Sequence, residues 1–237
     1  MDTLQELSAN GIVGVGPFPQ DCGTACTALG TSNPAFYYVC PTASTCTETP
    51  ESISQQVQNP VAMFSTDNNG VIVELPAVTT TGAPSVNGSM IFGIGTQSNN
   101  GLGSAKVFTV DQNTGNFTTV FKGTPSSNSF IDSGSNGIFF LDTTTTGIPV
   151  CGTSAKGFYC PNSAQNLTAT QQGANGTTGT VSFSVANAST LFMSNNFAFN
   201  DLAGPNANTF DWGLPFFFGR NVYTGMQTAT QSPYWAY

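Results

Sequence analysis

The sequence predicts a mainly β protein with few, short helices. The chain has 237 residues, of which 26 are Gly and only 7% are charged. Short apolar runs alternate with turn-forming segments rich in Gly, Ser, Thr and Asn, which is typical of many strands joined by tight turns. No long segment shows the 3.6-residue period of an amphipathic helix. A chain of this length is large enough for one sizeable β core.

Taken in order, the elements support this class. Asp67-Asn68-Asn69-Gly70 is a hairpin-turn sequence and predicts strands on both sides of it. The expected strands cover 11–17, 61–65, 71–75, 89–93, 105–110, 117–122, the run before Asp132, 181–185 and 189–193. The expected loops cover the Cys-rich stretch 20–50 and the polar stretch 162–180.

Charge and composition exclude several classes of function. The net charge is −8, with only four cations and no histidine. Without a basic patch the chain cannot follow a phosphate backbone, so we expect no nucleic-acid partner and no attraction to an anionic membrane. The absence of histidine excludes Ser-His and Cys-His catalysis within this chain, as well as histidine-ligated metal sites. We expect no cofactor, and no apolar run approaches the ~20 residues of a membrane span.

The six cysteines form three local pairs in the sequence: Cys22 and Cys26, Cys40 and Cys46, Cys151 and Cys160. A zinc site is the alternative, but the spacings lack a repeated Cys-x2-Cys pattern. We therefore predict three local disulfides and an exported protein, periplasmic, extracellular or at the cell surface. Residues 1–6 do not resemble a signal peptide, so we expect the targeting segment to lie outside this chain.

One carboxylate stands out by its setting. Asp132 lies between two strongly apolar runs, in the turn Asp132-Ser133-Gly134-Ser135. Gly134 allows a sharp backbone turn, and the hydroxyls of Ser133 and Ser135 are close enough to hydrogen-bond the carboxylate or the adjoining backbone. Such a turn can hold an acid at the base of a cleft, although Asp-Ser-Gly is also an ordinary turn sequence.

The order of these pieces resembles the second lobe of the pepsin-like aspartic peptidases, an acid-protease β-barrel. Asp132-Ser133-Gly134-Ser135 is similar to the Asp-Thr/Ser-Gly-Ser/Thr motif of that lobe, and the segment from Trp212-Gly213 to Tyr223 resembles its late hydrophobic-Gly segment. Gly11–Gly16 resembles the strand that closes the first lobe. The amino-acid sequence of residues 210–220 most resembles that of an uncharacterised bacterial family of exported proteins with this expected fold. We accordingly expect residues 1–60 to be a remnant of the first lobe with a Cys-rich loop, and 61–237 to be the second lobe.

The resemblance implies roles for these residues. Asp132 would be one of two catalytic carboxylates, with Ser133 locking the two active-site loops together and Ser135 bonding the outer carboxylate oxygen. Gly134 would let the loops approach, and Gly213 would line the strand behind them. The sequence contains no second Asp-Thr/Ser-Gly and no first-lobe flap, and Leu214 stands after Gly213 where many pepsin-like enzymes have Asp. Asp142, Asp201 and Asp211 lack the motif.

Three functions follow as hypotheses. The first is the C-terminal part of an exported aspartic-peptidase-like protein whose partner is a missing N-terminal lobe and whose substrate is a peptide or protein. This reading predicts an inactive isolated chain with an apolar face around Asp132. The second is a non-catalytic binding or surface module of the same fold. The third is an active homodimer, against which Gly11–Gly16 argues because a self-sufficient single lobe would not need that segment. An unrelated β-sandwich is the remaining alternative for the fold.

Overall fold

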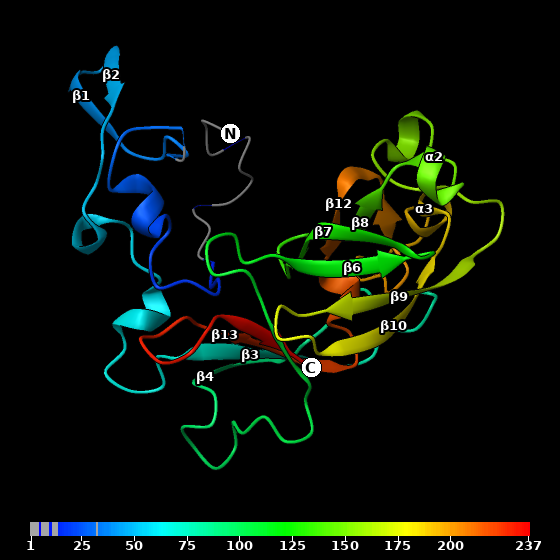
Figure 1. Cartoon of the computed structure of the whole chain (residues 1–237). Helices are drawn as coiled ribbons and strands as arrows, with labels where there is room; N and C mark the ends of the chain where they lie inside the picture. The colour runs from blue at the N-terminus through cyan, green and yellow to red at the C-terminus, as the bar shows by residue number, and fades with distance from the viewer. Residues whose placement is uncertain (1–4, 6–9, 11–13, 32) are drawn as a thin grey trace.

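A computed structural model describes residues 5, 10, 14–31 and 33–237, and it confirms the mainly β prediction. In this part of the chain the strands form sheets of two, seven and five strands (Figure 1). The α-helices α2 (Thr143–Thr146) and α3 (Ala188–Leu191) have four residues each. The same part of the chain also contains the 3-10 helices η1 (Gly23–Cys26), η2 (Ile53–Gln55), η3 (Pro60–Met63), η4 (Thr153–Ala155) and η5 (Leu214–Phe216).

The seven-stranded sheet forms a nearly closed barrel around an aromatic core. Its order is β10 (Thr178–Val185), β9 (Gln165–Gln172), β6 (Phe117–Phe121), β7 (Thr124–Ile131), β12 (Asn206–Trp212), β8 (Ile138–Leu141) and β11 (Ala203–Gly204). Phe183 of the edge strand β10 lies 5.4 Å, ring to ring, from Phe140 of β8 near the other edge. The sheet must therefore curl for these two strands to share one core.

The five-stranded sheet packs on the same core. Its order is β4 (Ser89–Phe92), β3 (Gly70–Leu75), β13 (Arg220–Gly225), β14 (Tyr234–Ala236) and β5 (Val107–Thr109). Val222 and Trp235 from this sheet belong to the same buried cluster as Phe210 and Trp212. The two sheets are thus one packing unit, and the short β12–β13 connection crosses between them.

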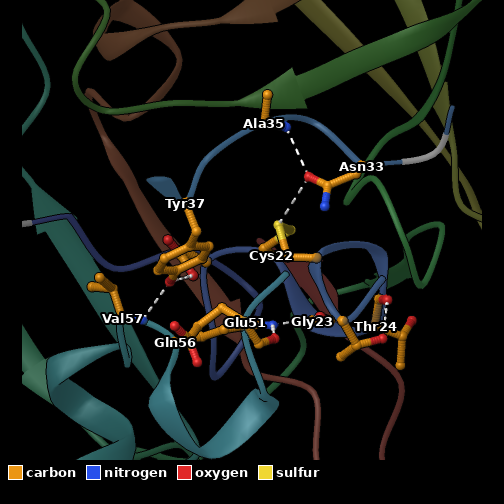
Figure 2. Close-up of a disulfide and its surroundings, with 12 residues drawn as sticks. Cys22, Gly23, Thr24, Asn33, Ala35, Tyr37, Glu51, Gln56 and Val57 are labelled. Carbon is orange, nitrogen blue, oxygen red and sulfur yellow. Dashed lines mark hydrogen bonds between the residues drawn. A yellow bond between two sulfur atoms is a disulfide. The ribbon is translucent and has the colours of Figure 1, made fainter. Parts of the chain in front are cut away.

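The N-terminal segment, defined here as residues 14–31 and 33–59, has a different build. It holds the hairpin of β1 (Tyr38–Thr42) and β2 (Thr45–Glu48), which extends away from both larger sheets (Figure 1). Figure 2 shows the surroundings of the Cys22 disulfide, where the Val57 amide donates to the Tyr37 hydroxyl at 2.6 Å and the Gln56 side-chain amide donates to Gly23 O at 2.8 Å. Side-chain hydrogen bonds and cross-links, more than apolar burial, fix the path of this segment.

All three predicted disulfides are present. The bonds join Cys22 to Cys26, Cys40 to Cys46, and Cys151 to Cys160. The third bond lies in the main body of the protein, beside a small buried cluster that includes Leu191 and Phe199. Within the described residues no helix is long and apolar enough to cross a membrane.

Two of the strand predictions were wrong because helix caps were overlooked. Residues 61–63 of the expected strand 61–65 belong to η3, where Pro60 occupies the first turn and the Asn59 side chain accepts a hydrogen bond from the Val61 amide. The expected strand 189–193 largely overlaps α3, whose first turn is capped by the Asn187 side chain accepting from the Thr190 amide. In both places an Asn cap outweighs the local β propensity.

The loop predictions also need correction. The polar stretch 162–180 contains β9 and the start of β10, which pair antiparallel over eight residues each. The stretch 20–50 contains the β1–β2 hairpin. Of the expected strand at 11–17, residues 11–13 lie outside the described residues, and 14–17 form no strand.

Candidate functional site

The turn that carries Asp132 is held by a strand inserted between its two arms. β7 leads into the turn and β8 leads out, but these strands are not neighbours, because β12 lies between them. β12 runs parallel to β7 and antiparallel to β8. The Asp132 amide donates to Trp212 O at 3.1 Å, and the Leu214 amide donates to Ser135 O at 2.7 Å. Both ends of the turn are therefore bonded to the end of β12.

The Asp132 carboxylate receives a hydrogen bond on each oxygen. The Gly134 amide donates to Oδ1 at 2.8 Å, and the Ser135 hydroxyl lies 3.0 Å from Oδ2. Asp132 is half-buried, whereas Ser133 is exposed. The predicted tight turn and its serine contact are confirmed. Ser133 forms no side-chain hydrogen bond within the described residues, so its proposed loop-locking role stays a prediction.

Gly213 lies directly behind the turn, and its position requires glycine. A Cβ placed there would lie 2.0 Å from Gly137 O and 2.7 Å from Ser135 O. The backbone at Gly213 is extended (φ −72°, ψ −166°), so the requirement comes from close approach of two backbones and not from an unusual φ. Gly213 thus fixes the distance between β12 and the Asp132 turn.

A wide, mostly apolar groove opens over this turn. Its volume is about 840 Å³, and its walls come from the N-terminal segment, the five-stranded sheet and β7. Apolar lining residues include Val15, Phe18, Val61, Met90, Phe92 and Phe217, and Asp132, Ser133 and Gly134 form part of its floor. Met90 and Phe92 are 53% and 41% exposed. The expected apolar face around Asp132 is therefore present.

A second carboxylate, Asp211, is joined to Asp132 through the same serine. The Ser135 hydroxyl lies 2.6 Å from Asp211 Oδ2, and Asp211 is only 5% exposed. Burial raises the pKa of the Asp211 carboxyl to about 6, the Ser135 hydrogen bond opposes this rise, and the negative charge of Asp132 adds to it. Asp211 lacks the Asp-Ser-Gly motif, so the sequence alone gives no reason to assign it a role.

The chain matches, over residues 1–237, a family model described as a protein of unknown function, DUF3443. The chain belongs to the DUF3443 family. A search of curated proteins finds no match.

Two other acids of the chain, Asp142 and Asp201, do not reach the groove floor. Asp142 caps α2, its Oδ1 accepting from the Thr145 amide at 2.8 Å. Asp201 is buried near the Cys151–Cys160 region, where its backbone carbonyl accepts from Ala186, and burial raises its carboxyl pKa. In the part of the DUF3443 chain that is described, no three His, Cys, Asp or Glu side chains gather to hold a metal ion.

Proposed function

We propose that this chain is the second lobe of an exported, pepsin-like aspartic peptidase and supplies one of its two catalytic carboxylates, Asp132. The observation that carries the proposal is the hydrogen bonding of the Asp132 carboxylate, with the Gly134 amide on one oxygen and the Ser135 hydroxyl near the other. The Ser135 contact is the one that the resemblance to the second-lobe motif implied, and the Gly134 amide adds a second donor to the same carboxylate.

The strand topology supports the same proposal. A carboxylate that must meet a reacting group needs a turn that does not move, and here β12 holds the turn from both sides. The contact at Gly213 leaves no room for a side chain between the strands. Preorganisation of this kind is what positions a catalytic group accurately.

The groove supports a polymeric, partly apolar ligand. Its volume of about 840 Å³ exceeds what a few side chains need, and apolar side chains dominate its walls, which suits an extended peptide or the face of another lobe. Exposed Met90 and Phe92 lie on β4, an edge strand of the five-stranded sheet. The six cysteines, all in disulfides, support export to an oxidising compartment.

The mechanism that follows needs a second carboxylate opposite Asp132. In such a site one acid protonates the scissile carbonyl while the other takes a proton from the attacking water, and the two share one proton because like charges about 3 Å apart cannot both ionise. Asp211 does not fill this role, because it is buried behind Ser135 and away from the open groove. We propose that the second carboxylate comes from a first lobe.

The test is proteolysis of unfolded casein between about pH 3 and 7, where a carboxylate pair titrates. We expect no cleavage by the 237-residue chain. We expect cleavage once the chain is expressed together with the polypeptide encoded upstream of it. That activity should be blocked by a transition-state-analogue inhibitor and lost in Asp132→Asn. Asp142→Asn is the matched control, because Asn also caps a helix. Activity that survives Asp132→Asn would refute the proposal, and inhibitor-sensitive cleavage by the chain alone would favour the homodimer.

The alternative function is a non-catalytic binding module of the same fold. It is favoured by the single carboxylate that the described residues place on the groove floor, Asp132. The two functions differ in what the upstream coding sequence should contain. A peptidase requires a second apolar-apolar-Asp-Thr/Ser-Gly motif there, whereas a binding module does not.

A further inference from the structure

Asp211 occupies an apolar position behind the groove floor. It lies on β12, in register with Phe130 of β7 and Phe139 of β8. Residues in register on neighbouring strands share one face of a sheet, so the carboxyl group lies between two phenylalanine positions. Its Oδ1 is buried and has no hydrogen-bond partner among the described residues. A buried carboxylate in such a setting is costly, which favours the neutral acid.

The contacts of Ser135 require a proton from one of the two acids. Its hydroxyl lies 3.0 Å from Asp132 Oδ2 and 2.6 Å from Asp211 Oδ2. A serine hydroxyl carries one proton and can donate it to one acceptor. If it donates to Asp132, the contact with Asp211 is a hydrogen bond only when Asp211 is the acid that donates to Ser135 Oγ.

We propose that Asp211 is a positioning residue that controls Asp132 through Ser135. While Asp211 is protonated, it donates to Ser135 Oγ, and the Ser135 hydroxyl is directed to the Asp132 carboxylate. When Asp211 loses its proton to solvent, it becomes the closer acceptor of the Ser135 hydroxyl, and Asp132 loses that donor. The importance of this switch for catalysis rests on the proposed function, but the switch itself does not.

The groups around Asp211 place the switch near neutral pH. Burial raises its pKa to about 6, against the opposing effect of Ser135. Among the charged side chains in the described part of the molecule, Asp132 is the one whose field adds to this rise. The neighbouring strands present Phe130 and Phe139, which bring no charge. The Asp132 donor should therefore be retained in acid and lost above about pH 6.

The test is carbon-13 NMR of the chain labelled at aspartate carboxyl carbons, followed from about pH 3 to 8. The signals of Asp132 and Asp211 are assigned from Asp132→Asn and Asp211→Asn. We expect the Asp211 signal to titrate near pH 6 and the Asp132 signal to show a second, smaller step at the same pH. That step should disappear in Asp211→Asn, whose amide donates to Ser135 at every pH, and persist in Asp142→Asn.

Ser135→Ala separates the switch from simple charge repulsion. The variant keeps both carboxylates but removes the hydroxyl that joins them, so the second step of Asp132 should shrink strongly. A step that persists at full size in Ser135→Ala would overturn the proposal, as would titration of Asp211 below about pH 5. The measurement needs no peptidase activity. Failure of the casein assay with a positive NMR result would therefore reject the proposed function and leave the switch in place.

Discussion

The N-terminal segment and the seven-stranded sheet are stabilised in different ways. In the sheet, Phe140, Phe210 and Trp212 are fully buried, and Phe210 stacks on both of the others. In the segment, large apolar side chains are exposed, among them Leu29, Phe36, Tyr38, Val39 and Val57. Two of the three disulfides lie within it. A segment that cannot bury an apolar core depends on cross-links instead.

Because of this difference, the groove is lined partly by the more stable sheet and partly by the less stable N-terminal segment. Asp132 belongs to the sheet, whereas Gly14–Phe18 of the N-terminal segment contribute one wall of the groove. Destabilising substitutions in the sheet should therefore unfold the whole protein, including the Asp132 turn. Destabilising substitutions in the N-terminal segment should open the groove and leave the Asp132 turn in place.

The largest expected effect is the loss of an aromatic ring from the sheet. Phe210→Ala should lower the free energy of unfolding by about 3–5 kcal/mol, because a cavity replaces a fully buried ring. Phe197→Ala is the control, since Phe197 is 84% exposed, and surface changes usually stay within about 0.5 kcal/mol. Denaturant unfolding monitored by tryptophan fluorescence measures both. Equal effects of the two changes would contradict the account of the sheet.

Within the sheet, ionisation of Asp211 should lower the free energy of unfolding at neutral pH. Its carboxyl has a pKa of about 6 in the folded protein against an ordinary value of 3.8. Between these values the folded state binds more protons than the unfolded state, so stability falls as pH rises through this range. Asn at this position cannot lose a proton.

The stability difference between Asp211→Asn and the original chain should thus change in favour of the variant by on the order of 3 kcal/mol between pH 3.5 and pH 7. Denaturant unfolding at both pH values measures this change. A difference that does not depend on pH would show that Asp211 ionises in the folded protein as it does in the unfolded chain.

The contact of the Asp132 turn with β12 gives the next effect. Gly213→Ala places a methyl group 2.0 Å from Gly137 O, and we expect a loss of about 1–3 kcal/mol as the turn is pushed away. Gly152→Ala is the matched control, because nothing lies within 4 Å of its Cβ. The NMR signal of the Asp132 carboxyl group should change in Gly213→Ala and stay unchanged in Gly152→Ala.

The smallest effect on global stability should come from the N-terminal segment. Replacing Cys22 and Cys26 by Ser removes a cross-link of four residues' separation. We expect the free energy of unfolding measured by tryptophan fluorescence to change by less than about 0.5 kcal/mol, because Trp212 and Trp235 lie in the main core. The Val57 amide, which donates to Tyr37, should exchange its hydrogen faster. Unfolding of the whole protein would show that the two regions are one cooperative unit.

The sequence predicts the features that are encoded locally. The Asp132 turn follows from Asp, Ser and Gly between apolar runs, and the disulfides follow from cysteines that are close in the chain. Strand β9 was missed because Gln, Asn and Thr occupy many of its positions and the apolar alternation is weak, whereas the alternation of Val181, Phe183 and Val185 predicts the second half of β10. Asp211 was missed because its importance depends on β12 lying between β7 and β8, a pairing of distant segments that local patterns do not encode.

The two-carboxylate site can be examined in a structure of the chain joined to the polypeptide encoded upstream of it. We expect a carboxylate from the first lobe about 3 Å from that of Asp132, across the groove floor and on the side away from Ser135. No first-lobe carboxylate within hydrogen-bonding reach of Asp132, with or without a bridging water, would contradict the two-carboxylate site and leave the binding module as the function.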